Sequence, residues 1–132
     1  PSAWRVEVTV ALRHADGRLL WVRDGAQRRL PGGGCAPHEA PWDAALRTLR
    51  AQTGLTARLD TLAGVYTHSN SQTTTLVFNA SSDLQTGADP VAGTWHPVDA
   101  PPADADPLHV ARAADSISAH GGPTLFRRET TD

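Results

Sequence analysis

Apolar and polar residues alternate along the first dozen positions of this chain. The apolar positions are Trp4, Val6, Val8, Val10 and Leu12. Arg5, Glu7 and Thr9 lie between them, and this period of two predicts a strand with one buried face. The segment 15–17 (Ala-Asp-Gly) is typical of a hairpin turn, so a second strand is expected to return over 19–22.

After Pro41 the period becomes that of a helix. Apolar residues recur at intervals of three and four, at Trp42, Ala45, Leu46 and Leu49. This spacing predicts one apolar helical face toward the core. Proline suits the first helical position because its missing N–H has no helical partner there. Gly54 favours the helix end, where a left-handed conformation is common.

The second half of the chain predicts more strands and one more helix. Strands are expected over 56–66, 73–79 and 94–98, with a polar loop at 68–72 and a longer loop over 81–93. Asp106 before Pro107 favours a helix start. The expected core stripe of that helix is Val110, Ala114 and Ile117, and the segment 121–123 (Gly-Gly-Pro) should end it. Residues 124–132 predict a short strand or a tail.

The order of these elements indicates one α/β domain over residues 1–132, with a mixed sheet between helices. The tryptophans Trp21 and Trp42 are expected in or near its core. Between the second strand and the first helix lies a glycine-rich turn, Gly32-Gly33-Gly34, where glycine permits tight backbone.

Residues 30–55 read LPGGGCAPHEAPWDAALRTLRAQTGL and resemble the Nudix box, G-x5-E-x7-R-E-U-x-E-E-x-G-U, in which U is a bulky aliphatic residue. The residues in register are Gly33, Glu39, Arg47, Leu49, Gly54 and Leu55. The segment 93–99 also resembles the strand that precedes the last helix in the Nudix family. The resemblance covers roughly residues 4–120 and implies the α/β/α sandwich fold of that family.

Members of the family typically hydrolyse nucleoside diphosphates linked to another group, with a divalent metal, usually Mg²⁺. The helix glutamates of the family fall here on Thr48, Ala51 and Gln52. A hydroxyl, a methyl and an amide do not balance a divalent charge, and Mg²⁺ prefers anionic oxygen ligands. Arg47 and Arg50 add positive charge to the same helix. We therefore expect no metal site, and Mg²⁺ as cofactor only if hydrolysis is retained.

The surviving box residues predict two kinds of role. Glu39 and Arg47 are the candidates for retained chemistry, and the simpler role for Glu39 is to pair with Arg47 and hold the loop against the helix. Arg47 is expected to bind Glu39, Asp43 or an anion, and Asp43 is its i,i+4 neighbour. A metal-free site for a phosphorylated or nucleotide-like ligand is expected at Gly33, Gly34, Arg47, Arg50 and Gln52. A protein partner is the other binding hypothesis.

Two enzymatic alternatives stay open. The fold is either repurposed, for example for biosynthetic tailoring, or a weak hydrolase of nucleoside diphosphate derivatives. Acid and base groups for a new reaction would come from Glu39, His38, His68, Asp83, Asp89 and Asp99.

The composition of the chain limits the classes of partner and the cellular compartments that we expect for this protein. A net charge of −2 provides no basic field for nucleic acid. Cys35 is the one cysteine, which excludes an internal disulfide and favours a reducing compartment. No apolar run approaches the roughly 20 residues of a membrane span, and no signal-peptide pattern precedes Trp4. We expect a cytoplasmic protein, and the resemblance adds a homodimer as an option because dimers are common in the family.

Overall fold

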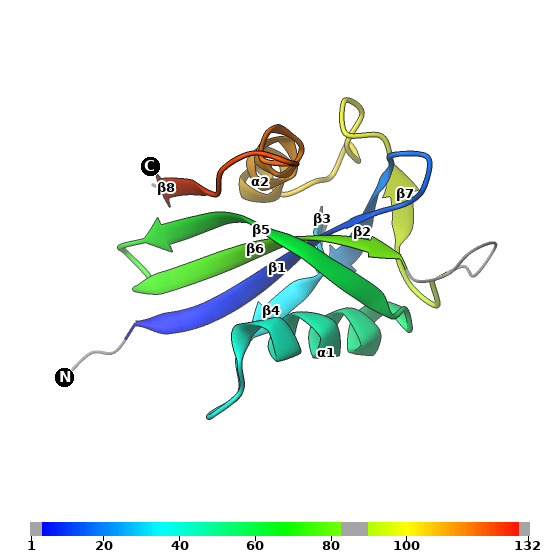
Figure 1. Cartoon of the computed structure of the whole chain (residues 1–132). Helices are drawn as coiled ribbons and strands as arrows, with labels where there is room; N and C mark the ends of the chain where they lie inside the picture. The colour runs from blue at the N-terminus through cyan, green and yellow to red at the C-terminus, as the bar shows by residue number, and fades with distance from the viewer. Residues whose placement is uncertain (1–3, 83–89, 130–132) are drawn as a thin grey trace.

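The computed structural model of this chain describes residues 4–82 and 90–129. Within them, eight strands form a sheet that lies between two helices (Figure 1). In chain order the elements are β1 (Arg5–Arg13), β2 (Leu19–Asp24), β3 (Gln27–Arg29), β4 (Gly32–Gly34), α1 (Pro41–Thr53), β5 (Ala57–His68), β6 (Thr73–Ser82), β7 (Thr94–His96), α2 (Pro107–Ser118) and β8 (Leu125–Glu129).

The sheet is mixed, as the sequence predicts. Its order is β3-β2-β1-β6-β5-β8, with β4 paired to β1 and β7 to β2. The central strand β1 runs antiparallel to β2 and β4 and parallel to β6. At the far edge, β8 runs parallel to β5, so the segment from 124 contains a strand within its described part.

The glycine triplet is a strand, which corrects the expectation of a turn. Gly32, Gly33 and Gly34 pair with Thr9, Val8 and Glu7 of β1, in that order. Of the three glycines only Gly32 has a positive φ, at 152°. A Cβ atom built there would lie 2.0 Å from the Val8 carbonyl oxygen. Glycine is therefore required at position 32 for the close approach of two backbones.

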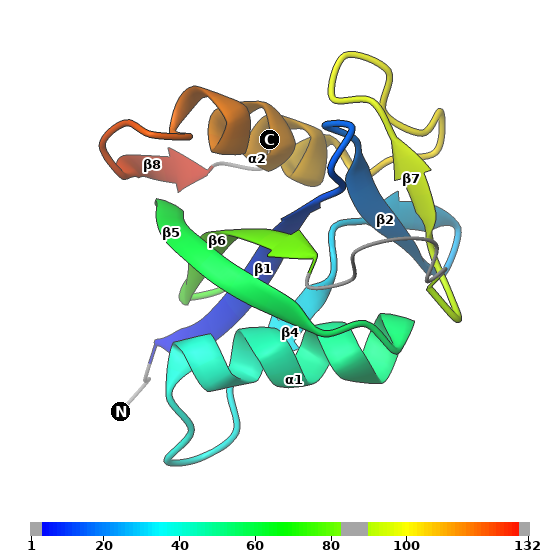
Figure 2. The same ribbon diagram turned by 45° about the vertical axis from the view of Figure 1, so that its right-hand side comes forward.

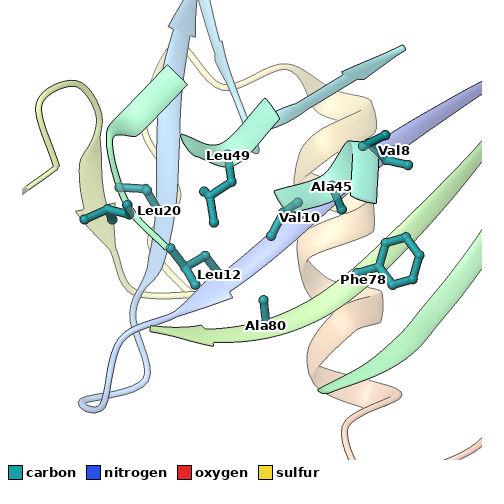
Figure 3. Packing of buried hydrophobic residues seen from close by; sticks show 10 residues of the cluster. Val8, Val10, Leu12, Leu20, Ala45, Leu49, Phe78 and Ala80 are labelled. Carbon is teal, nitrogen blue, oxygen red and sulfur yellow. The ribbon is translucent and has the colours of Figure 1, made fainter. Parts of the chain in front are cut away.

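One face of the sheet is covered by α1, and Figure 3 shows the apolar cluster between them. The cluster includes Val8, Val10 and Leu12 of β1 and Ala45 and Leu49 of α1. The predicted apolar helix face was wrong at its edge. Trp42 is 59% exposed and Leu46 is 37% exposed, whereas Thr48 is buried. Trp21, by contrast, is buried as expected.

The opposite face is covered by α2, as the turned view in Figure 2 shows. Asp106 caps this helix, because its carboxylate accepts the Leu108 N–H at 2.9 Å. The expected core stripe was wrong at Ala114 and Ile117, which are exposed, whereas Val110 is half-buried and packs against the core. The buried positions are His109, Arg112, Ala113 and Ser116. The prediction missed these positions because a buried Arg and His replace apolar side chains on the inner face.

Other expectations differ from the structure mainly in boundaries. The hairpin between β1 and β2 is present, with Gly17 at φ 94°. Gln27–Arg29, which is outside the strands predicted from the sequence, is a strand paired with β2. Helix α1 begins at Pro41 and ends at Thr53, and Gly54 caps it in the left-handed conformation, as expected. Among the described helices none has both the length and the apolar character needed to cross a bilayer.

Candidate functional site

The loop that enters α1 is closed by an ion pair between Glu39 and Arg47. The Arg47 Nε atom donates to Glu39 Oε2 at 2.8 Å, and Nη2 donates to Oε1 at 2.9 Å. The same Nη2 atom donates to the Gly34 carbonyl oxygen at 3.0 Å, and Glu39 accepts the Ala36 N–H at 2.9 Å. Glu39 therefore joins the loop to the helix while Arg47 joins the helix to β4.

This pairing decides between the partners expected for Arg47. The bond from Arg47, together with the Ala36 N–H, lowers the pKa of the Glu39 carboxyl to about 2. Asp43, the i,i+4 neighbour, is exposed. Among the described residues Arg47 forms its ion pair with Glu39 instead. A carboxylate held this firmly in its ionised form is a poor proton acceptor at neutral pH.

Thr48 occupies the first of the three positions that hold glutamates in the Nudix pattern. Its side chain is buried, and its hydroxyl donates to the Ala44 and Ala45 carbonyl oxygens at 2.8 and 3.2 Å. A Cβ atom at Gly33 would lie 3.4 Å from the Thr48 methyl carbon. The side chain packs between the helix and β4 and is already bonded within the helix.

Gln52, at the third position, is bound to the backbone of Gly32. Its Nε2 atom donates to the Gly32 carbonyl oxygen at 2.6 Å, and its Oε1 atom accepts the Gly32 N–H at 3.1 Å. Arg29 Nη2 donates to the same carbonyl oxygen at 3.3 Å. The Gly32 peptide is thus satisfied at both ends, and its oxygen faces two donors.

Ala51, at the second of the three positions, and Arg50, which precedes it, are both exposed. The methyl of Ala51 offers no ligand atom. Across the part of the chain that the structure describes, Arg50 takes no ion pair or side-chain hydrogen bond from another residue, so its donors face solvent. Of the two arginines of this helix, Arg50 is therefore the one whose guanidinium is available to bind a ligand.

The predicted ligand set separates into two groups. Arg47 and Gly34 are brought together by a hydrogen bond, with Glu39 as the shared partner. Gln52 belongs instead to the neighbourhood of Gly32. Sequence reasoning missed Arg29 there. Strand alternation was the available signal, because a buried Leu30 places Arg29 on the opposite face of the chain.

A divalent ion does not fit this corner of the described structure. The Thr48 hydroxyl is bonded to the helix, both polar atoms of Gln52 are bonded to Gly32, and the Gly32 oxygen receives two donors. Over residues 4–82 and 90–129 no three His, Cys, Asp or Glu side chains are grouped to hold a metal. The donor set here is neutral or cationic, which is the opposite of what Mg²⁺ requires.

The described groups considered for other chemistry make no hydrogen bond to one another. His38 is in the exposed loop before α1 with φ 64°, and His68 bonds to Ser71 at 3.2 Å. Asp99 is exposed. Asp83 and Asp89 lie outside the described residues. Cys35 is half-buried, and burial raises the pKa of its thiol.

Comparison with known proteins agrees with this architecture. The model of the NUDIX domain matches residues 3–117. The chain belongs to the NUDIX family. A MutT-like protein of Streptomyces ambofaciens is 27% identical over 126 residues, which are 92% of this chain and 82% of that protein.

Two solved structures show the shared fold. An ADP-ribose pyrophosphatase from Streptococcus suis has a TM-score of 0.74 at 16% identity, over 95% of this chain and 98% of that one. A UDP-X diphosphatase has a TM-score of 0.71 at 18% identity, over 95% of this chain and 68% of that one. The predicted NUDIX α/β/α fold, with its mixed sheet, is thereby confirmed.

Proposed function

We propose that this NUDIX domain binds a nucleotide-like or phosphorylated ligand without a divalent ion and does not hydrolyse pyrophosphate through its box. The observation that carries the proposal is the state of the three altered positions. Thr48 and Gln52 have their polar atoms bonded within the fold, and Ala51 has none. The water-activating and charge-neutralising work of a metal therefore has no anionic support at these three positions.

The ligand class follows from the similar proteins and from the charges left in place. Two structural neighbours carry names that refer to ADP-ribose and to UDP-X. In this chain Arg50 lies three residues after Arg47, so the two side chains leave the helix from neighbouring positions. Arginine binds phosphate through paired N–H donors without a metal. We assign the ligand phosphates to Arg50, with Arg47 and the strand from Gly33 to Gly34 as the adjoining surface.

Gln52 has a supporting part in this proposal. Its side-chain amide is hydrogen-bonded to the Gly32 backbone, so Gln52 holds β4 in place. The arginines then make the contacts with the ligand. The groups considered for a repurposed enzyme give less support to a second function, since Glu39 bonds to Arg47 and Ala36 and His68 bonds to Ser71.

Calorimetric titration of the purified chain with ADP-ribose and with a UDP-sugar tests the proposal. We expect binding of similar affinity in EDTA and in MgCl₂, and no release of nucleoside monophosphate in either buffer. Arg50→Ala should weaken binding by roughly tenfold or more, because a charge-assisted phosphate contact is lost. Arg128→Ala is the matched control, since Arg128 is an exposed arginine on β8 at the far edge of the sheet.

Turnover that requires Mg²⁺ or Mn²⁺ would contradict the proposal and support a weak hydrolase. In that case the combined change Thr48→Glu, Ala51→Glu and Gln52→Glu should raise the rate strongly. Binding seen only with a metal present would contradict the metal-free site even without turnover.

A further inference from the structure

The peptide of Gly32 is the point where the end of α1 meets β4. Gln52 bonds to both its N–H and its carbonyl oxygen, and Arg29 approaches the oxygen from β3. We infer that Arg29 and Gln52 form an ion-free joint, in which their N–H donors occupy the place that a cation would need. The folded state then gains no stability from divalent ions, and exchange of these two donors for acceptors would make it depend on one.

Saturation of the Gly32 oxygen is the first part of the argument. A carbonyl oxygen has two lone pairs, and here it faces the donors Gln52 Nε2 at 2.6 Å and Arg29 Nη2 at 3.3 Å. A cation at this oxygen would have to displace at least one donor and lie beside a guanidinium charge. Turning the Gln52 amide would not help, because its oxygen would leave the Gly32 N–H.

Arg29 is bound to this corner rather than free to withdraw. It is about 29% exposed, and its Nε atom lies 3.4 Å from Asp24 Oδ2. The same Nε atom is buried without a hydrogen-bond partner among the described residues. A guanidinium in this position places a positive charge next to the Gly32 oxygen. The joint therefore contains its own cation.

The backbone at Gly32 makes this joint sensitive. The close approach to Val8 leaves no room for a side chain at position 32, so β4 cannot shift toward β1. A carboxylate in place of the Gln52 amide is acceptor-only and would direct an oxygen at the Gly32 oxygen. Two facing oxygens are relieved by a cation between them, which is the arrangement that Mg²⁺ or Mn²⁺ prefers.

The test compares thermal unfolding of the whole chain in EDTA and in millimolar MgCl₂ or MnCl₂. The wild-type midpoint should be the same in all three buffers. For Arg29→Met combined with Gln52→Glu, the midpoint in EDTA should fall by roughly 5 °C or more. The metal buffers should restore at least half of that loss. Gln52→Glu alone should show a smaller dependence, since Arg29 still supplies charge.

Two controls separate this effect from a general one. Gln27→Glu makes the same charge change at an exposed position of β3 and should give no ion dependence. Gln52→Met removes both hydrogen bonds of the Gln52 side-chain amide without adding charge. The midpoint of thermal unfolding of this variant should therefore fall equally in every buffer. Its Gly32 amide should also exchange faster with deuterium than in the wild type, whatever the buffer.

A wild-type midpoint raised by Mg²⁺ would overturn the inference, as would a folded double variant indifferent to ions. If the double variant folds only when Mn²⁺ is present, the inference stands. If it folds in no buffer, the Gln52→Met exchange rate decides, and an unchanged Gly32 rate rejects the joint. These readouts concern stability, so they are independent of whether Arg50 binds the ligand proposed above.

Discussion

The two faces of the sheet use the same kind of bond in different surroundings. On the α1 face Arg47 pairs with Glu39, with side chains 49% and 17% exposed. On the α2 face Arg112 pairs with Glu129, with side chains 9% and 8% exposed. Water can replace a lost partner of Arg47 but has little access to Arg112. An Arg–Glu pair therefore orders an exposed loop on one face of the sheet and stabilises the packing of a helix on the other.

The buried pair belongs to a larger network. The Arg112 guanidinium lies 5.5 Å from the centroid of the Tyr66 ring. The Tyr66 hydroxyl donates to Asp115 at 2.8 Å, and Arg127 donates to the same carboxylate at 2.6 and 3.0 Å. Burial and the Asp115 charge raise the pKa of Tyr66, so its hydroxyl remains a donor. The network ties α2 to β5 and β8, which explains why polar residues occupy the inner face of that helix.

The largest expected effect comes from breaking the buried pair. Glu129→Ala should lower the free energy of unfolding by about 3–5 kcal/mol, because it leaves the Arg112 charge buried and unpaired. Urea unfolding measures the loss, and Glu39→Ala on the other face is the matched control with a much smaller cost. Arg112→Met combined with Glu129→Leu should recover most of the stability. Equal losses from the two single changes would remove the distinction between the faces.

Next in size is a change at the backbone contact of the α1 face. Gly32→Ala should cost about 3 kcal/mol, because the new Cβ would collide with the Val8 carbonyl oxygen at a strained φ. Gly34→Ala is the control in the same strand, where a Cβ meets nothing within 4 Å. It should change stability by no more than about 0.5 kcal/mol in urea unfolding. A similar result for both glycines would show that β4 is free to adjust.

A pH titration of stability separates the two faces by their titrating groups. Burial, with the Arg112 and Arg29 charges, lowers the pKa of His109 from 6.5 to about 3. The unfolded chain then binds the extra proton between pH 6.5 and 3, so stability falls as pH falls through that window. The slope for one such group approaches about 1.4 kcal/mol per pH unit. His109→Gln should flatten the curve there, and an unchanged slope in this variant would show that His109 is not the titrating group.

Glu39 should act in a lower and narrower window. Its pKa is lowered from 4.5 to about 2, so the stability it contributes is present above pH 4.5 and lost as pH falls toward 2. The difference in unfolding free energy between the wild type and Glu39→Gln should therefore shrink over that range. A difference that persists unchanged at pH 2 would show that the Arg47 bond is not what holds the carboxylate.

The smallest expected effect is Ala51→Glu. Ala51 is exposed on α1, and glutamate is a good helix former. The free energy of unfolding should therefore change by less than about 0.5 kcal/mol. Thr48→Glu, at a buried position of the same helix, should cost clearly more. Circular dichroism melts of both variants give the comparison. Similar costs at the two positions would mean that the helix can rotate to accept a carboxylate.

Much of the fold could be predicted because it depends on local patterns. The period of two gave β1, the Pro41 and Gly54 signals gave the ends of α1, and the Asp106 cap was also found. The glycine segment was missed as a strand because three glycines carry no side-chain period. The inner face of α2 was missed because a buried Arg112 looks polar until Glu129 is placed beside it.

For the candidate site, the sequence predicted which chemical groups are present and the fold decided what they do. The pairing of Glu39 with Arg47 was expected, since both lie within one loop and helix. The hydrogen bonding of the Gln52 amide to Gly32, twenty residues away, was not expected. Neither was the approach of Arg29, whose guanidinium reaches the Gly32 oxygen three residues further along the chain.

The family, the order of the elements and the loss of three carboxylates from the box helix could all be predicted from residue patterns. They could be predicted because periodicity, capping and residue charge are properties of short segments. Three further features became known from the folded structure: the Gly32 oxygen is saturated, Trp42 faces water and Arg112 is buried. These outcomes depend on contacts between segments far apart in the chain, and such contacts set burial and hydrogen-bond partners.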